Sequence, residues 1–149
     1  MIKTYCLPKS FRYFNIISKH SNVYLDKALE PFELCSCHRV FIHKISEQPG
    51  ITRDKIKMIA HIHPSNTTRT IDYLEEKGYI IKKTNEQDKR ICELFPTDKL
   101  KEVYQVLIRT EEEWINVITK DFSNEDKEKY REFLKLSMAL SVECIHGTK

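Results

Sequence analysis

The stretch from Pro64 to Ile80, "PSNTTRTIDYLEEKGYI", has small polar side chains in its first half and an amphipathic pattern in its second. Hydroxyl, amide and guanidinium groups hydrogen-bond base edges and phosphate oxygens, and the N–H groups at a helix N-terminus also favour phosphate. Asp72 and Glu76 in the second half would repel a polyanion. The pattern therefore predicts a helix whose first two turns contact DNA. The candidate residues are Ser65, Asn66, Thr67, Thr68 and Arg69.

A solvated helix with a polar start would explain this stretch equally well, and the basic residues that follow it favour DNA. They flank a polar turn, "NEQDK", at residues 85–89. A hairpin here would place cations beside the helix, where a second groove or the DNA backbone lies. The candidate residues of this wing are Lys82, Lys83, Asp88, Lys89 and Arg90.

Two histidines, His61 and His63, occupy the predicted turn before the helix. A metal site there would need a third ligand, and no carboxylate or cysteine lies near them in the sequence. We interpret them as turn residues close to phosphate, where protonation would favour DNA binding at low pH.

The five cysteines are odd in number, irregular in spacing and without an export signal, so we expect reduced thiols. Cys35, Cys37 and His38 could suggest zinc, but on an α-helix Cys35 and His38 share a face while Cys37 points elsewhere. We interpret the cluster as buried thiols and expect no metal and no other cofactor. We likewise interpret Cys6 as a plain thiol rather than a redox sensor.

Several elements must position these side chains, and periodicity, caps and turn residues define them. Helices are predicted over residues 10–29, 34–46, 53–60, 64–77, 98–120 and 124–144, and strands over 79–84 and 90–95. Thr52, Thr97 and Ser123 are the predicted N-caps. The predicted fold is mainly α with a small β-hairpin, a winged helix-turn-helix flanked by N- and C-terminal dimerisation helices.

The long amphipathic helices carry more apolar surface than one winged helix can bury, so we infer a homodimer. Residues 1–33 and 97–149 would form the helical dimerisation region, and residues 34–96 the DNA-binding domain, as one intertwined unit. The aromatic residues of the helices are assigned to the core or the dimer interface rather than to a ligand site. They are Phe11, Phe14, Tyr24, Phe41 and Trp114.

Composition and charge agree with this assignment. The chain has 149 residues, 40% hydrophobic and 32% charged, with three glycines, which disfavours disorder and a loop-rich β fold. The formal net charge is only +3, but residues 51–90 hold nine Lys/Arg against six Asp/Glu, while residues 91–149 hold nine against twelve. Without a long apolar run we expect a cytoplasmic protein that does not enter the membrane. Without a phosphate loop or catalytic triad pattern we expect no enzyme.

The run "TTRTIDYLEEKGYIIKKTNEQDKRICELFPT", residues 67–97, resembles the helix-to-wing signature of MarR-type transcription regulators. That signature is approximately T-x-x-apolar-D-x-L-E-x-K-G, then a D-x-R wing, then L-T. The residues in register are Asp72, Leu74, Glu75, Lys77, Gly78, Asp88, Arg90 and Thr97. The order of the helices extends the resemblance to about residues 10–145. Lys57, His61, Pro96 and Leu100 depart from the usual pattern.

The resemblance implies a homodimer whose terminal helices interlock and whose two winged helices bind pseudo-palindromic double-stranded DNA. Residues 65–69 would enter the major groove, Arg90 would reach the minor groove, and Asp88 would position that arginine by a charge-assisted hydrogen bond. A repressor released by a small aromatic effector, or by metal or oxidant, is the expected function. A winged-helix protein-interaction module that does not bind DNA remains the alternative, with a thiol- or metal-dependent enzyme as a third possibility.

Overall fold

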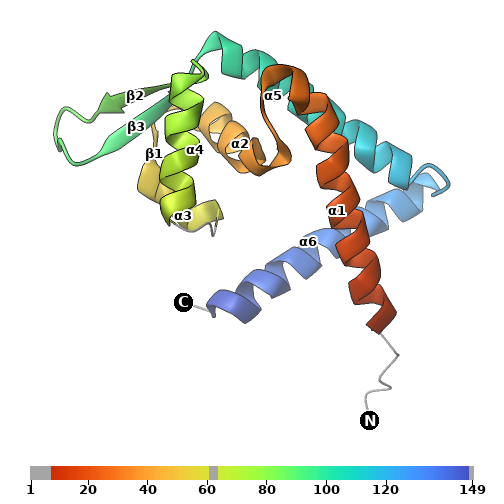
Figure 1. Cartoon of the computed structure of the whole chain (residues 1–149). Helices are drawn as coiled ribbons and strands as arrows, with labels where there is room; N and C mark the ends of the chain where they lie inside the picture. Colours follow the sequence, from red (N-terminus) through yellow and green to blue (C-terminus); the bar gives the residue numbers. More distant parts are fainter. Residues whose placement is uncertain (1–7, 61–63, 148–149) are drawn as a thin grey trace. The chain divides into compact units, whose positions relative to one another are not determined.

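The computed structural model describes residues 8–60 and 64–147, which form two compact units, Met1–Glu112 and Glu113–Lys149 (Figure 1). The first unit holds α1 (Pro8–Leu29), α2 (Arg39–Glu47), α3 (Arg53–Ala60), α4 (Pro64–Glu76) and most of α5 (Asp98–Ile118), with strands β1 (Ile51–Thr52), β2 (Ile80–Thr84) and β3 (Cys92–Pro96). Two 3-10 turns, η1 (Glu30–Phe32) and η2 (Ser36–His38), link α1 to α2. The second unit holds the end of α5 and α6 (Asn124–His146). Across the described ranges, no helix is long and apolar enough to cross a lipid bilayer.

The three predicted N-caps are confirmed. Thr52 Oγ1 accepts a hydrogen bond from the backbone N–H of Lys55 at 3.2 Å, and Thr97 Oγ1 accepts from Leu100 at 3.3 Å. Ser123 Oγ accepts from the backbone N–H of Asp126 at 3.1 Å. Each hydroxyl satisfies a donor that the first turn of its helix cannot, which fixes where α3, α5 and α6 begin.

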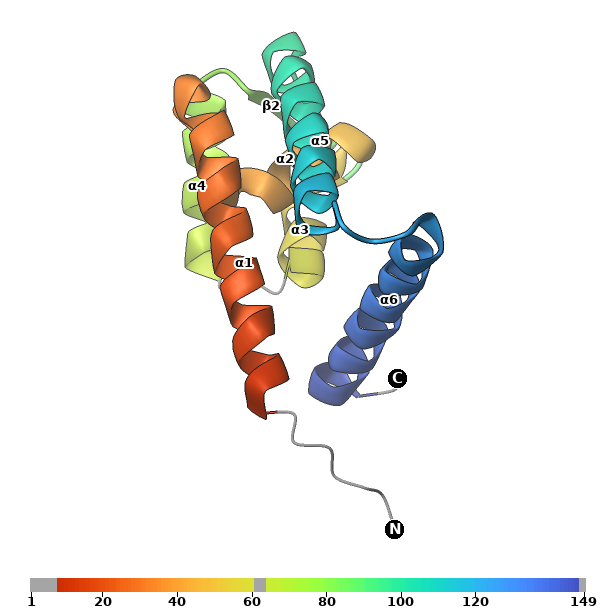
Figure 2. The ribbon, with the colours of Figure 1, turned by 90° about the vertical axis from the view of Figure 1, so that its right-hand side faces the viewer.

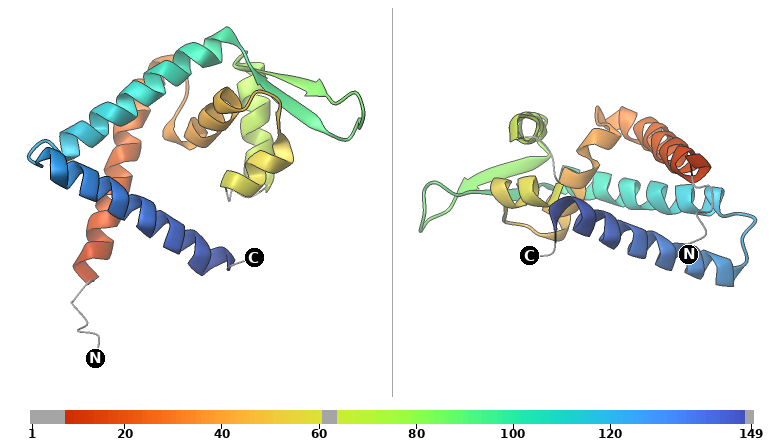
Figure 3. Two further views of the ribbon diagram at one scale, coloured as in Figure 1. Left: turned by 180° about the vertical axis from the view of Figure 1, so that it is seen from behind. Right: turned by 90° about the horizontal axis from the view of Figure 1, so that it is seen from below.

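The sheet is antiparallel with strand order β1-β3-β2. The predicted hairpin is confirmed, with Ile80 opposite Pro96 and Thr84 opposite Cys92. The two residues of β1 were not predicted as a strand because two residues are too few for an alternation pattern; Ile51 pairs with Leu94. In both views of Figure 3 the β2–β3 hairpin extends beyond α3 and α4. It therefore has the shape and place of a wing.

The core of the first unit lies where α2 meets α1, α4 and α5, and Figure 2 shows α2 between α4 and α5. Its fully buried side chains include Leu29, Phe41, Ile45, Ile71, Leu74, Leu94, Leu100 and Leu107. Tyr79, which is also buried, donates from its hydroxyl to the carbonyl of Phe32 at 2.7 Å. The start of the wing is thereby fastened to the α1–α2 connection.

The second predicted helix begins later than expected. Cys35 is extended, with φ −140° and ψ 170°, and the α-helix starts only at Arg39. The reason is tertiary: Asp26 Oδ1 accepts from the backbone N–H of Ser36 at 2.7 Å, and His38 Nδ1 accepts from that of Cys35 at 3.0 Å. An α-helix beginning at residue 34 would leave these two N–H groups without an acceptor, and the two side chains instead hold Cys35 and Ser36 outside the α-helix.

Each unit exposes large apolar side chains. On α1, Leu25 and Leu29 are buried, whereas Phe14 and Ile17 are exposed. The second unit exposes a longer set on α6: Phe133, Leu134, Leu136, Met138, Leu140, Val142 and Ile145. Of the aromatic residues assigned above, Phe41 lies in the core, whereas Phe11 and Phe14 do not.

Candidate nucleic-acid interface

The first half of α4 is polar and open to solvent. Ser65, Asn66, Thr68 and Arg69 are exposed, as their positions on the helix predict. Thr67 must be removed from the set of residues expected to face DNA, because its side chain is only 1% exposed. Thr67, Ile71 and Leu74 recur at helical spacing and share the buried face, so the period of the helix excludes Thr67 from the outer surface.

The two histidines expected at the turn, His61 and His63, lie outside the described residues.

The second half of α4 is acidic, and part of its charge is balanced by a lysine of β2. Lys82 Nζ on β2 lies 2.5 Å from Asp72 Oδ1 and 2.8 Å from Glu75 Oε2. Partial burial opposes the charge on Lys82, but the hydrogen bonds to Asp72 and Glu75 outweigh it and raise the pKa of this amine. The ammonium group of Lys82, which was expected to contact DNA, is thus paired with two carboxylates of α4, and its contact with DNA stays a prediction.

The wing is held in shape by an asparagine. Asn85 Oδ1 accepts from the backbone N–H groups of Gln87 at 2.9 Å and Asp88 at 3.0 Å, and its amide donates to Glu93 Oε1 at 2.7 Å. Asp88 Oδ1 accepts from the backbone N–H of Arg90 at 2.9 Å. Asp88 thus positions Arg90 by a charge-assisted hydrogen bond, as predicted, and the bond is made to the backbone of Arg90.

Three cations of the wing remain at the surface. Lys89 and Arg90 are exposed near the tip of the hairpin. Lys83 Nζ lies 4.8 Å from the centroid of the Phe95 ring, a cation–π distance that restricts where this exposed lysine can reach. These residues can present positive charge to a phosphate backbone from one side of α4.

Sequence reasoning missed one further cation, Arg53. It lines a hollow of about 150 Å³ together with Thr68 of α4, and a second hollow of about 170 Å³ together with Arg90 of the wing. Arg53 therefore lies between the polar start of α4 and the hairpin, and Lys57 follows one turn later in the first hollow. Arg53 directly follows the Thr52 cap and so lies at the positive end of the helix dipole, where a cation is unfavourable. This unfavourable position was the feature of the sequence that could have identified Arg53.

The chain resembles known proteins over this same region. A model of the MarR family matches residues 40–92. The uncharacterized HTH-type transcriptional regulator YybA of Bacillus subtilis is 37% identical over 89 residues, which span 60% of this chain and 59% of that protein. The HTH-type transcriptional regulator BilQ of Clostridioides difficile is 30% identical over 119 residues, which span 80% of this chain and 78% of that protein.

Solved structures agree over nearly the full length. A MarR protein from Peptoclostridium difficile matches with a TM-score of 0.82 and 30% identity, covering 96% of this chain and 92% of that one. A MarR family regulator from Listeria monocytogenes, solved in complex with a 26mer DNA, matches with a TM-score of 0.78 and 25% identity, covering 93% and 95%. The winged helix agrees with these matches, and the chain belongs to the MarR family of transcriptional regulators.

Proposed function

We propose that the protein is a homodimeric repressor that binds a pseudo-palindromic double-stranded DNA operator and is released by a signal. One observation carries the proposal. Arg53 of α3 lies between the exposed polar half of α4 and Arg90 of the wing, while Lys82 pairs with two carboxylates of the acidic half. Positive charge thus borders the part of the helix that can read bases, and negative charge is masked where contact ends.

In the proposed complex the first half of α4 enters the major groove. Asn66, Thr68 and Arg69 offer amide, hydroxyl and guanidinium groups to base edges, and an arginine pairs with guanine through two hydrogen bonds. Ser65, at the start of the helix, lies where backbone N–H groups favour a phosphate. Arg90 extends toward the minor groove in the manner of a wing.

A second copy of the chain would cover the exposed apolar side chains. Such patches on a soluble domain mark interaction surfaces. A two-fold dimer places two identical α4 helices on one duplex, which is why the operator is expected to be pseudo-palindromic. The family match supports this assembly, and action on DNA is consistent with a cytoplasmic location.

The proposed signal is a small aromatic molecule that binds one state of the dimer better than the other. A ligand can shift DNA affinity only by its differential affinity for the two states. A thermal-shift screen of small aromatic acids against the purified protein tests this part, because a ligand that prefers the native dimer raises its melting temperature.

DNA binding is tested by fluorescence anisotropy on the DNA upstream of the protein's own gene at two salt concentrations. Arg69→Ala and Arg90→Ala should each weaken binding about tenfold or more, because a base or groove contact contributes about 1–3 kcal/mol. Lys101→Ala, which removes an exposed lysine of α5 paired with Asp98, is the matched control and should bind as the wild type does.

Unchanged binding in both arginine variants would refute the assignment of α4 and the wing. For phosphate contacts, the logarithm of the affinity falls linearly with the logarithm of the salt concentration. If binding to a partner lacks this dependence, the protein-interaction module is favoured instead.

A further inference from the structure

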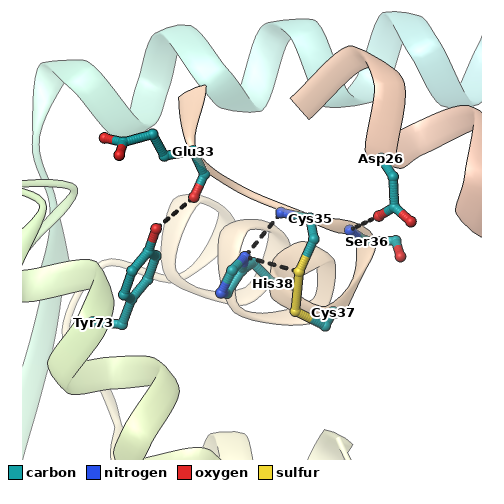
Figure 4. Close-up of a disulfide and its surroundings, with 7 residues drawn as sticks. All are labelled: Asp26, Glu33, Cys35, Ser36, Cys37, His38 and Tyr73. Atoms are coloured by element: carbon teal, nitrogen blue, oxygen red, sulfur yellow. Dashed lines mark hydrogen bonds between the residues drawn. A yellow bond between two sulfur atoms is a disulfide. The ribbon is translucent and has the colours of Figure 1, made fainter. Parts of the chain in front are cut away.

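A cluster of metal-ligating side chains lies in the connection between α1 and α2, outside the interface described above. The ligand atoms of Cys35, Cys37 and His38 all lie within 4.8 Å of one another. Cys35 Sγ is 3.4 Å from His38 Nδ1, and Cys35 and Cys37 form a disulfide with their Cα atoms 5.3 Å apart. Figure 4 shows the two sulfur atoms and the imidazole ring turned toward one another.

In an α-helix Cys37 would point away from Cys35, and the two could not share a metal ion. The extended Cys35 and the 3-10 turn that follows it remove that objection, because they bring both sulfur atoms to one side of the loop. The expectation of buried, reduced thiols is also corrected: Cys35 and Cys37 form a disulfide, Cys37 is exposed, and Cys35 and His38 are half-buried. The cluster can be reached from solvent and is held by Asp26, which accepts from the N–H of Ser36.

We propose that, with its disulfide reduced, this cluster binds one thiophilic divalent cation through Cys35 Sγ, Cys37 Sγ and His38 Nδ1. A dithiol reductant supplies two electrons and two protons, which break the S–S bond and give two thiols. The cation then displaces the two thiol protons, and water completes a tetrahedral site. Two thiolates and a neutral imidazole favour an ion such as Zn²⁺ over Mg²⁺ or Ca²⁺, and they balance its charge.

The site is joined to α4. The His38 ring is stacked on the ring of Tyr73 with centroids 5.3 Å apart and planes 7° from parallel, and Tyr73 donates from its hydroxyl to the carbonyl of Glu33 at 2.6 Å. Glu33 in turn pairs with Lys77 at 2.8 Å. A cation on His38 Nδ1 takes the lone pair that now accepts the N–H of Cys35, so the ring, and Tyr73 with it, must adjust. This step rests on the proposed function, since it makes DNA affinity depend on the cation.

Metal binding is tested on the reduced full-length protein without DNA. Equilibrium dialysis against Zn²⁺ should give one ion per chain for the wild type, and Co²⁺ should give the charge-transfer absorption of thiolate ligands. Cys37→Ser should lower Zn²⁺ affinity about tenfold or more, as should Cys35→Ser. Cys144→Ser, an exposed cysteine on α6, is the matched control and should behave as the wild type.

Cys37→Ser decides the matter because Cys37 is exposed and its replacement should leave the fold intact, which circular dichroism checks. Wild-type Zn²⁺ affinity in this variant would overturn the site. Oxidation by one equivalent of hydrogen peroxide, which accepts two electrons from the two thiols and leaves a disulfide and two waters, should abolish binding. Retained Zn²⁺ binding after complete oxidation would also overturn it.

The coupling is tested by measuring operator affinity with Zn²⁺ and with a chelator. A change of about threefold or more in the wild type that is absent from Cys37→Ser supports it. Equal affinities in the wild type, with Zn²⁺ bound, overturn the coupling. Absence of DNA binding under every condition, with one Zn²⁺ still bound per chain, would instead refute the proposed function.

Discussion

At the scale of single residues, Lys82 is paired within the chain at the edge of the proposed interface. Its side chain is 27% exposed and contacts Asp72 and Glu75, so it joins β2 to α4 and screens two carboxylates. Sequence patterning identified Lys82 as one of several cations near the wing. It could not identify the partners, because the three residues meet only when the strand folds back along the helix.

Replacement of Lys82 separates screening from direct contact. Lys82→Met should weaken operator binding about threefold to tenfold, since uncovering carboxylates near a phosphate backbone costs on the order of 1 kcal/mol. Under the screening role, Asp72→Asn added to Lys82→Met should recover part of the affinity, as anisotropy titration would detect. An equal loss in the single and double variants would identify a direct phosphate contact instead.

At the scale of elements, α2 is attached to α5 by a charged contact beside the apolar core. His43 Nε2 lies 2.9 Å from Glu111 Oε2, and His43 Nδ1 lies 3.4 Å from Glu47 Oε1. The hydrogen bond with Glu111 raises the pKa of His43 above its usual 6.5, against the opposing effect of partial burial. The protonated ring can donate to both carboxylates at once.

This contact should make stability depend on pH. A pKa raised in the folded state gives stability that is complete below the unfolded value of about 6.5 and is lost as pH rises through the higher folded value. Urea unfolding at fixed protein concentration should therefore show His43→Gln less stable than the wild type by about 1 kcal/mol near pH 6, with the gap closing near pH 9. His20→Gln, on the exposed part of α1, is the control; a gap independent of pH would contradict the role of protonation.

The elements themselves were largely predictable. Helix starts followed from Thr52, Thr97 and Ser123, because a cap is a local contact between neighbours in the sequence. The 3-10 turn at residues 36–38 was not predictable, since it depends on Asp26 ten residues earlier. The candidate site was also predictable only in part. The exposure of residues on α4 follows from the helical period, whereas the position of Arg53 between α4 and the wing depends on tertiary structure.

At the scale of the whole molecule, the apolar surfaces left open within each unit support the proposed homodimer. In the second unit Phe133 is 64% exposed and lies among other apolar residues of α6. Burying side chains of this size stabilises an association by about 1.5–3 kcal/mol each. Exposed singly they would need no explanation, but several on one helix do.

Replacing one exposed apolar side chain of α6 by a charged one tests the proposed dimer. Phe133→Glu should shift the protein from dimer toward monomer, because a carboxylate cannot be buried there without a partner. Sedimentation equilibrium should show a dimer dissociation constant about tenfold or more above that of the wild type. Lys135→Glu, on the same helix and in an exposed ion pair with Glu132, should leave it nearly unchanged. A monomeric wild type would contradict the dimer.

Gly78, between α4 and the wing, has a left-handed backbone conformation. Its φ is +75°, and among the described residues no heavy atom would lie within 4 Å of an added Cβ. An L-residue is disfavoured at this angle by its own backbone rather than by crowding, whereas a D-residue prefers it. A D-alanine introduced by chemical synthesis would therefore suit this junction better than any of the L-amino acids, and it would stiffen the point from which the wing departs.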